Sequence, residues 1–239
     1  MRPNQNHDAE PSMTQTPAKS AASPWFRQPR NLIVLALALV AVIVGVFVVV
    51  NRDSGRGSAT AKVGSGPNKT LADYFSANDV TQTPVRPGDP GIPTITIPVP
   101  PGWSDAGPDT PSGAYAEIIY DAATNPDDAP FVEVLLSRLD GSVDPRQVLE
   151  YAPGELRNLP DYRPVSEPMH TKLTGFDAVQ LAGLYTKDGQ ERIIAQKTVV
   201  VPTSMGMFVV QMNADGPKSD APVVQQVTAH IDERSTITA

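Results

Sequence analysis

The amino-acid sequence predicts an α+β domain, an antiparallel β-sheet flanked by helices, which follows a single transmembrane helix. Three observations support this prediction. Residues 32–50 are nineteen consecutive residues, all apolar except for one Gly, and a helix of ~20 such residues crosses a bilayer core. Residues 176–201 contain two apolar runs joined by a tight hairpin turn. Helical patterns stand before, between and after the predicted strands, which is typical of an α+β domain.

Cysteine content and charge exclude several classes of function. The chain has no Cys, which excludes disulfides, thiolate zinc sites, a Cys nucleophile and acylation at a lipoprotein Cys. Residues 1–62 carry seven Lys or Arg against three Asp or Glu, a net charge of +4. Residues 63–239 carry twelve against twenty-three, a net charge of −11. Because this part has no basic run, we expect no nucleic-acid partner.

The segments around the apolar run predict how the chain is placed in a membrane. Residues 1–31 are rich in Pro and polar side chains, so we expect a disordered tail. Arg27 and Arg30 precede the run Leu32–Val50, which predicts a single-pass protein of the inner membrane with a cytoplasmic N-terminus and an extracytoplasmic domain. The alternative is a signal peptide cleaved at residues 59–61. That pattern lies well beyond the run, which exceeds the roughly 7–15 residues of a signal-peptide core.

The linker and the start of the domain follow the apolar run. Residues 51–69 are rich in Gly and Ser, so we expect a flexible linker before a domain at residues 70–239. Asn68 begins a glycosylation sequon, but we interpret this stretch as the start of a helix at residues 70–76. Thr70 is an N-cap candidate for that helix, whose shared apolar face carries Leu71, Tyr74 and Phe75.

Three apolar runs predict the first strands, at residues 94–97, 114–120 and 131–139. Trp103 stands at the end of a predicted turn, and we interpret it as a core anchor rather than as a stacking platform for a ligand. The acidic loop at residues 125–128 could bind calcium. It lacks the ligand spacing of an EF-hand loop, so we favour a solvated turn.

A helical segment begins after Asp144, an N-cap candidate that precedes Pro145 at the first helical position. Its apolar face carries Val148, Leu149 and Ala152. Pro153-Gly154 is expected to end this helix, and a second short helical turn is expected to reach residue 158. Residues 162–173 are weakly patterned, and we predict one or two edge strands there.

The strongest local signal is the hairpin at residues 176–201. Asp188-Gly189 forms the predicted turn and pairs Lys187 with Gln190. Alternation then divides the side chains between two faces. One face carries Phe176, Ala178, Gln180, Ala182 and Leu184 opposite Ile193, Ala195 and Lys197. The other carries Val179, Leu181, Gly183 and Tyr185 opposite Arg192, Ile194 and Gln196. Because both faces are substantially apolar, we expect the sheet to be covered on both sides, or one side to line a cavity.

The chain ends with a further predicted strand and a helix. Residues 207–213 alternate as a strand does. Asp220 is an N-cap candidate for the last helix. Its apolar face carries Val223, Val224, Val227 and Ile231.

The residues reveal no catalytic constellation. The sequence has no G-x-S-x-G nucleophile elbow and no Walker or Rossmann Gly pattern. His230 and Glu233 are spaced to share a metal ion on the last helix, but two ligands at a helix end are a weak signal, and we favour no metal site. We therefore expect no catalytic residue, no metal, no cofactor and no enzyme activity.

Several stretches of this chain resemble the mycobacterial LpqN/LpqT family of cell-envelope lipoproteins. They are GPNKTLADYF, TPVRPGDPGIPTITIPVPPGW, DPRQVLEYAPGELRNLP, AQKTVVVP and FVVQMNAD, in order between about residues 66 and 239. The resemblance implies a PsbP-like fold, a non-enzymatic envelope role, and an association with trehalose glycolipids of the mycolate type and with MmpL-class lipid exporters. The chain departs from the family in having no Cys to acylate. Here the uncleaved helix would replace the lipid as the anchor.

Two functions follow from these observations. The first is an accessory protein that binds an acylated glycolipid, or a lipid exporter, in envelope lipid traffic. A ligand site between the sheet and its helices would then use an apolar wall with two amides, and Gly183 would leave room for the ligand. The expected ligand-binding residues are Val179, Leu181, Gly183, Tyr185, Ile194, Gln196 and Gln211. The alternative is a protein–protein adaptor without a lipid ligand.

Overall fold

The computed structural model describes residues 66–239. The predicted tail at residues 1–31, the predicted transmembrane helix at residues 32–50 and most of the predicted linker, residues 51–65, lie outside the described residues. Within residues 66–239, no helix is both long enough and apolar enough to cross a membrane.

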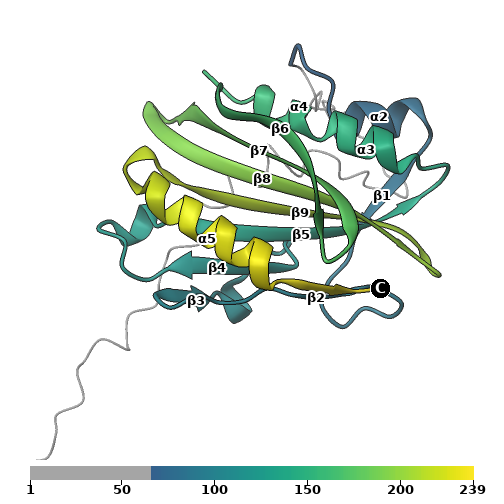
Figure 1. Cartoon of the computed structure of the whole chain (residues 1–239), viewed down its shortest axis with the longest axis horizontal. Coiled ribbons are helices and arrows are strands. Elements are labelled where there is room, and N and C mark those ends of the chain that lie inside the picture. Colours follow the sequence, from purple (N-terminus) through teal and green to yellow (C-terminus); the bar gives the residue numbers. More distant parts are fainter. Residues whose placement is uncertain (1–65) are drawn as a thin grey trace, which may run out of the picture. The chain divides into compact units, whose positions relative to one another are not determined.

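The domain is built on an antiparallel sheet of eight strands (Figure 1). Seven strands follow the order β3-β4-β5-β9-β8-β7-β6, and β1 pairs with the far end of β5. The strands are β1 Thr81–Pro84, β3 Trp103–Asp105, β4 Ala116–Tyr120, β5 Phe131–Asp140, β6 Arg163–Leu173, β7 Phe176–Lys187, β8 Gln190–Thr203 and β9 Gly206–Pro217. A separate two-stranded sheet joins β2 (Thr94–Thr96) to β10 (Thr236–Thr238). The sequence therefore predicted the α+β class and the antiparallel sheet correctly.

Helices cover the sheet from opposite sides. The α-helices are α2 Leu71–Ala77, α3 Pro145–Tyr151, α4 Pro153–Arg157 and α5 Ala221–Arg234, and the short 3-10 turns are η2 Gly107–Asp109, η3 Pro126–Asp128 and η4 Lys218–Asp220. Helix α5 crosses the near face in Figure 1 and packs on side chains such as Val210 and Met212 of β9. Helices α2 and α3 pack with Val209 of β9 and Val200 of β8, which alternation places on the other side. We call the two sides the α5 face and the α4 face.

The central hairpin has the predicted register. Lys187 pairs with Gln190 across the Asp188-Gly189 turn, and the pairing continues without a shift to Ala178 and Val199. The turn requires a left-handed backbone at both positions, with φ of 53° at Asp188 and 77° at Gly189, which Asp-Gly tolerates. The division of side chains between the two faces is therefore confirmed.

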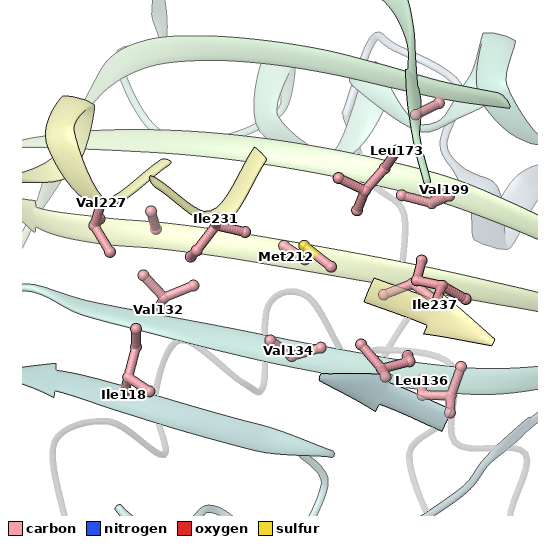
Figure 2. Close-up of a cluster of buried hydrophobic side chains, with 14 of the residues drawn as sticks. Ile118, Val132, Val134, Leu136, Leu173, Val199, Met212, Val227, Ile231 and Ile237 are labelled. Atoms are coloured by element: carbon pink, nitrogen blue, oxygen red, sulfur yellow. The ribbon is translucent and has the colours of Figure 1, made fainter. Parts of the chain in front are cut away.

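The α5 face carries the larger hydrophobic core. Figure 2 shows aliphatic side chains from β4, β5, β8 and β9 meeting Val227 and Ile231 of α5 and Ile237 of β10. Trp103 belongs to this cluster with 9% of its surface exposed, and its ring packs against that of Tyr120 at a centroid distance of 5.4 Å. The interpretation of Trp103 as a core anchor is confirmed. Trp103 ends a turn, in which its amide donates to the Pro100 carbonyl at 3.1 Å, and it also begins β3.

The predicted helix starts and stops are largely correct. Thr70 and Asp73 form a capping box, in which the Thr70 amide donates to Asp73 Oδ2 at 2.7 Å. Asp144 Oδ1 accepts from the amide of Arg146 at 2.9 Å and caps α3. Helix α3 ends before Pro153, and α4 begins there. Asp220 precedes α5 as predicted, but its side chain makes no capping hydrogen bond, because η4 leads the backbone directly into the helix.

The edge strand β6 agrees with the prediction of one or two edge strands, since it is one strand with two register shifts. Two features differ from the sequence-based expectations. The strands β1 and β10 are too short and too polar to give a pattern, and β2 pairs with β10 outside the main sheet. Residues 66–69, expected in the linker, pack on α4. Asn68 donates its amide N–H to Asn158 Oδ1 at 3.1 Å, and Asn158 Nδ2 donates to the Asn68 carbonyl at 2.8 Å.

Candidate functional site: a buried polar row on the α4 face

The predicted apolar wall exists, and the protein's own side chains cover it. Leu181, Tyr185 and Ile194 lie together on the α4 face, where they pack against Leu156 of α4 and against Leu159. Gly183 leaves no room for a ligand, because a Cβ at this position would lie 2.2 Å from the ring of Tyr162. That part of the prediction is wrong, and the physical reason is that the loop after α4 fills the space. Val179, the remaining apolar member, packs under α2 and α3.

Beside this wall, a row of polar side chains crosses four strands. Glu117 of β4 is paired with Glu133 of β5, Glu133 with Asn213 of β9, and Asn213 with Gln196 of β8. Alternation places all four on the α4 face, because Ile118 and Val132 belong to the core of the α5 face. Directly opposite residues on antiparallel strands have Cβ atoms about 4.5–5.5 Å apart, so the row is continuous.

Every member of this row is buried. The exposed fractions are 5% for Glu117, 2% for Glu133, 0% for Asn213 and 2% for Gln196. Within residues 66–239, the row holds one direct side-chain hydrogen bond, from Gln196 Nε2 to Asn213 Oδ1 at 3.0 Å. Burying a polar group without a partner costs about 1–3 kcal/mol, so these side chains destabilise the domain unless something else pairs with them.

Four polar atoms in and beside the row have no hydrogen-bond partner among the described residues. They are Glu133 Oε1, Gln196 Oε1, Asn213 Nδ2 and Thr198 Oγ1. Thr198 is buried on the same face, two residues after Gln196 and opposite Gln211. A native domain leaves few such atoms, and a cluster on one face indicates a place where a water or a ligand completes the structure.

Helix α4 approaches the row through one carboxylate. Glu155 is partly exposed, and its Oε2 accepts from Gln211 Nε2 at 2.7 Å. The predicted position of Gln211 beside Gln196 is confirmed, since both lie on the α4 face of neighbouring strands. The polar row, Thr198, Gln211 and Glu155 together form what we call the polar site.

The three carboxyl groups of the polar site hold protons more strongly than exposed carboxyls do. Burial, followed by the neighbouring charge of Glu133, raises the pKa of Glu117 to about 7. Burial raises the pKa of Glu133 to about 7. Burial also raises the pKa of Glu155 to about 7, against the opposing effect of hydrogen bonds from Gln211 and Gln196. At neutral pH the site therefore contains carboxyls in both protonation states, which accept and donate hydrogen bonds.

A network of ion pairs lies beside the polar site on the same face, where Asp215 follows Asn213 by two residues on β9. Asp215 is fully buried, and it accepts from the Tyr185 hydroxyl at 2.7 Å and from Arg192 Nε at 2.7 Å. Arg192 also pairs with Asp128. Burial raises the pKa of Asp215, although the charge of Arg192 and the hydrogen bond from Tyr185 lower it in part. Asp128 is thus an ion-pair partner in a loop that we interpreted as a solvated turn, and Tyr185 serves this network.

The α5 face has a different opening, a half-open hollow of about 150 Å³ between α5 and the strands β7 and β8. Its floor is a row of small residues, Ala182, Ala195 and Ala214, which are directly paired across β7, β8 and β9. Lys197 borders the hollow and holds Asp232 of α5 at 2.6 Å. Two predicted ligand-binding residues, Leu181 and Gln196, also border it. A space of this volume accepts a group of about the size of benzene.

Sequence reasoning missed Glu117, Glu133, Glu155, Thr198 and Asn213. A usable signal existed on β5, where Glu133 interrupts the apolar run FVEVLL, and on β9, where Gln211 and Asn213 interrupt FVVQMNAD. Polar residues at alternate positions of strands that are otherwise apolar indicate a shared polar patch, but the strand order was needed to bring them together.

The unpartnered atoms of the polar site are hydrogen-bonding groups, and no metal-binding cluster lies among residues 66–239. No cluster of three or more His, Cys, Asp or Glu side chains in the described chain has a suitable arrangement for a metal ion. His230 and Glu233 lie on α5, away from the polar site. The unpartnered atoms include acceptors and a donor, which together suit hydroxyl groups.

Comparison with known proteins places the chain in a family. The family model described as probable lipoprotein LpqN matches residues 67–238. Lipoprotein LpqN of Mycobacterium tuberculosis is 43% identical over 174 residues, which cover 73% of this chain and 76% of that protein. The lipoprotein LpqT of Mycobacterium leprae is 26% identical over 156 residues, which cover 63% of this chain and 68% of that protein.

A solved structure agrees with this result. The crystal structure of LpqN, a protein described as involved in cell envelope biogenesis of Mycobacterium tuberculosis, matches with a TM-score of 0.69 and 44% sequence identity. The match covers 73% of this chain and 100% of the LpqN chain in that crystal structure. The resemblance noted from the sequence motifs is confirmed over most of the domain, and the chain belongs to the LpqN/LpqT family of lipoproteins.

Proposed function

We propose that this protein is a non-enzymatic accessory protein of the cell envelope that binds an uncharged, acylated sugar on its α4 face. The envelope role rests on the family, whose member LpqN is described as involved in cell envelope biogenesis. The proposed ligand binding rests on one observation, the cluster of four buried polar atoms in the polar site that have no partner among the described residues. A sugar hydroxyl both donates and accepts, so a few hydroxyls would satisfy these atoms together.

The apolar wall next to the polar site would receive the acyl part of such a ligand. Leu181 and Ile194 are neighbours of Gln196 on the same face, so the wall and the row are continuous. Leu156 of α4 covers this wall. The ligand would therefore reach the wall only after α4 moves outward. Helix α4 has five residues, and a helix this short owes its stability to packing rather than to its own hydrogen bonds.

We also propose how the chain is anchored to the membrane. The apolar run Leu32–Val50 would anchor the chain in the inner membrane, with residues 51–239 outside the cytoplasm. This anchor would take the place of the acylated Cys, since the sequence has no Cys. A lipid exporter of the MmpL class is the proposed protein partner, because it would supply or accept the same acylated sugar. Protease added to intact spheroplasts should digest the domain and spare the tail, and the reverse pattern would contradict this topology.

The test of the ligand is calorimetry of the full chain in lipid nanodiscs, with trehalose monooctanoate as the acylated sugar and octanoate as the matched free acid. We expect saturable one-to-one binding of the ester, with empty nanodiscs as the reference. In Gln196→Met, the wall keeps its volume but the row loses an amide, so we expect ester affinity to fall by at least about tenfold.

The matched control is Gln180→Met, which makes the same replacement on the same hairpin but on the α5 face. This variant should bind the ester as the wild type does. Equal losses in both variants, or no binding of the ester to the wild type, would contradict a ligand site on the α4 face.

The protein–protein adaptor remains a second candidate function, and the hollow on the α5 face favours it. The hollow is large enough for one apolar side chain of a partner, and Met169 of β6, paired with Gln180 at its border, is 54% exposed. A variant that fills the floor, Ala195→Leu, should abolish capture of an envelope protein in crosslinking and leave ester binding unchanged. Capture that survives this variant would count against the hollow as the docking point.

A further inference from the structure

We infer that Glu117 and Glu133 determine the ligand class of the polar site, in that they select an uncharged hydroxyl-rich headgroup and reject an anionic one. This inference rests on the proposed function and deepens it. The two carboxyls are directly opposite each other on β4 and β5, and both are buried. They lie at the end of the row that is farther from α4. With the acyl chain on the apolar wall beneath α4, a headgroup that binds along the row would contact them.

No free cation balances these carboxyls within the described chain. Of residues 66–239, the cations with buried side chains are Arg192 and Lys197. The carboxylates of Asp215 and Asp128 occupy Arg192. Lys197 lies on the α5 face, where Asp232 holds it. A phosphate, sulfate or carboxylate headgroup would therefore meet negative charge in a water-poor place, where repulsion is stronger than in bulk water.

The remaining groups that face the row support the same conclusion. Gln196, Asn213 and Thr198 are neutral. Of their unpartnered atoms, Gln196 Oε1 can only accept a hydrogen bond and Asn213 Nδ2 can only donate one. Glu155 of α4 adds a third carboxyl above Gln211. The raised pKa values of all three carboxyls show that the site already resists negative charge without a ligand. A hydroxyl can donate to a carboxylate and accept from an amide or a protonated carboxyl.

The alternative is that the two carboxyls only hold buried water and play no part in selection. The two explanations differ in one measurable respect. If the carboxyls select by charge, neutralising them should raise the affinity for an anionic ligand and leave a neutral ligand of equal chain length nearly unaffected. If they only hold water, both ligands should respond alike.

The experiment compares octyl glucoside with octyl sulfate, which share one alkyl chain and differ in headgroup charge. Both are titrated below their micelle concentrations into the full chain in nanodiscs, with empty nanodiscs as the reference. We expect the wild type to bind octyl glucoside at least about tenfold more tightly than octyl sulfate at pH 8. In the double variant Glu117→Gln and Glu133→Gln, octyl sulfate should bind at least about tenfold more tightly than before, and octyl glucoside should change by less than about threefold.

The pH dependence adds a second measurement. The sulfate group keeps its charge between pH 5.5 and 8.5, whereas Glu117 and Glu133 lose protons near pH 7. Selection against octyl sulfate should therefore grow as the pH rises in the wild type. It should grow much less in the double variant, in which Glu155 is the one carboxyl of the polar site that still loses a proton near pH 7. Glu150→Gln with Glu233→Gln, two exposed glutamates outside the site, is the matched control and should behave as the wild type does.

The outcomes separate the inference from the proposed function. If trehalose monooctanoate and octyl glucoside both fail to bind the wild type, the proposed function fails and the inference fails with it. If they bind but octyl sulfate binds equally well, or if the double variant keeps the wild-type selectivity, the ligand site stands and the inference is overturned. Thermal melting of both double variants verifies that they fold.

Discussion

The two faces of the sheet differ in the polarity of their buried side chains. The α5 face carries the larger apolar core, in which Val132, Val134, Val210 and Met212 meet apolar side chains of α5. The α4 face uses the alternate residues of the same strands and mixes an apolar wall with Glu133, Asn213 and Gln196. The α5 face is thus mainly apolar, whereas the α4 face combines apolar packing with buried polar atoms that have no partner among the described residues.

The distribution of unpartnered atoms makes this difference concrete. Among residues 66–239, five buried side-chain polar atoms lack a hydrogen-bond partner. Four of them belong to the α4 face, and the fifth, Ser235 Oγ, follows the end of α5. Because a partnerless buried polar atom is destabilising, these four atoms lower the stability that apolar packing supplies on both faces.

The largest expected effect concerns the α5 face. Trp103→Ala should destabilise the domain by ~3–5 kcal/mol, because it removes a buried ring that packs on Tyr120 in the core of the α5 face. Chemical denaturation of the full chain in detergent, followed by tyrosine fluorescence or circular dichroism, measures this loss. A loss below ~1 kcal/mol would show that the ring contributes little to the core and would break the comparison.

A second variant tests the partnered charges of the α4 face. Arg192→Met should destabilise the domain by about 3–4 kcal/mol, because Asp215 would stay fully buried without its cation. The double variant Arg192→Met with Asp215→Asn should recover part of this loss, since it removes the stranded charge as well. A single variant as stable as the wild type would argue that the network is not structural.

Replacing Glu133, whose Oε1 has no partner among the described residues, should stabilise the domain instead of destabilising it. The folded-state pKa of Glu133 is about 7, above its ordinary value of 4.5, so the folded state holds the proton more strongly than the unfolded state does. Its contribution is therefore fully present below pH 4.5 and is lost as the pH rises through 7. Glu133→Gln should stabilise the domain by on the order of 2–3 kcal/mol at pH 8 and change little at pH 4.

Thermal melting at several pH values measures this effect, and Glu167→Gln on the exposed edge strand is the control. A Glu133 variant that is less stable than the wild type at pH 8 would mean that a bound group already satisfies the carboxylate.

The smallest expected effect compares two adjacent residues of β8. Thr198 has an unpartnered hydroxyl on the α4 face, and Val199 is buried in the core of the α5 face. Thr198→Val should be neutral or stabilise by up to about 1 kcal/mol, whereas Val199→Thr should destabilise by about 1–2 kcal/mol. Equal changes in the free energy of unfolding for these two isosteric replacements would erase the difference between the faces.

Much of the fold followed from local patterns in the sequence. The capping box at Thr70, the cap at Asp144 and the Asp188-Gly189 turn are all present as predicted. Each depends on residues within a few positions of one another, so sequence alone contains the necessary information. The hairpin register then determined which residues of β7 and β8 share a face.

The site depended on information that local patterns lack. Glu117, Glu133, Asn213 and Gln196 come from four strands, and only the order β4-β5-β9-β8 aligns them in one row. The position of α4 over Leu181 and Ile194, and of Tyr162 over Gly183, likewise depends on contacts between distant segments. By itself the sequence determined the strands other than β1, β3 and β10, two of the three predicted helix caps and the alternation of side chains, because these are properties of neighbouring residues. Tertiary structure alone decided which polar side chains meet and what covers them, because strand order and helix packing minimise the free energy of the whole chain.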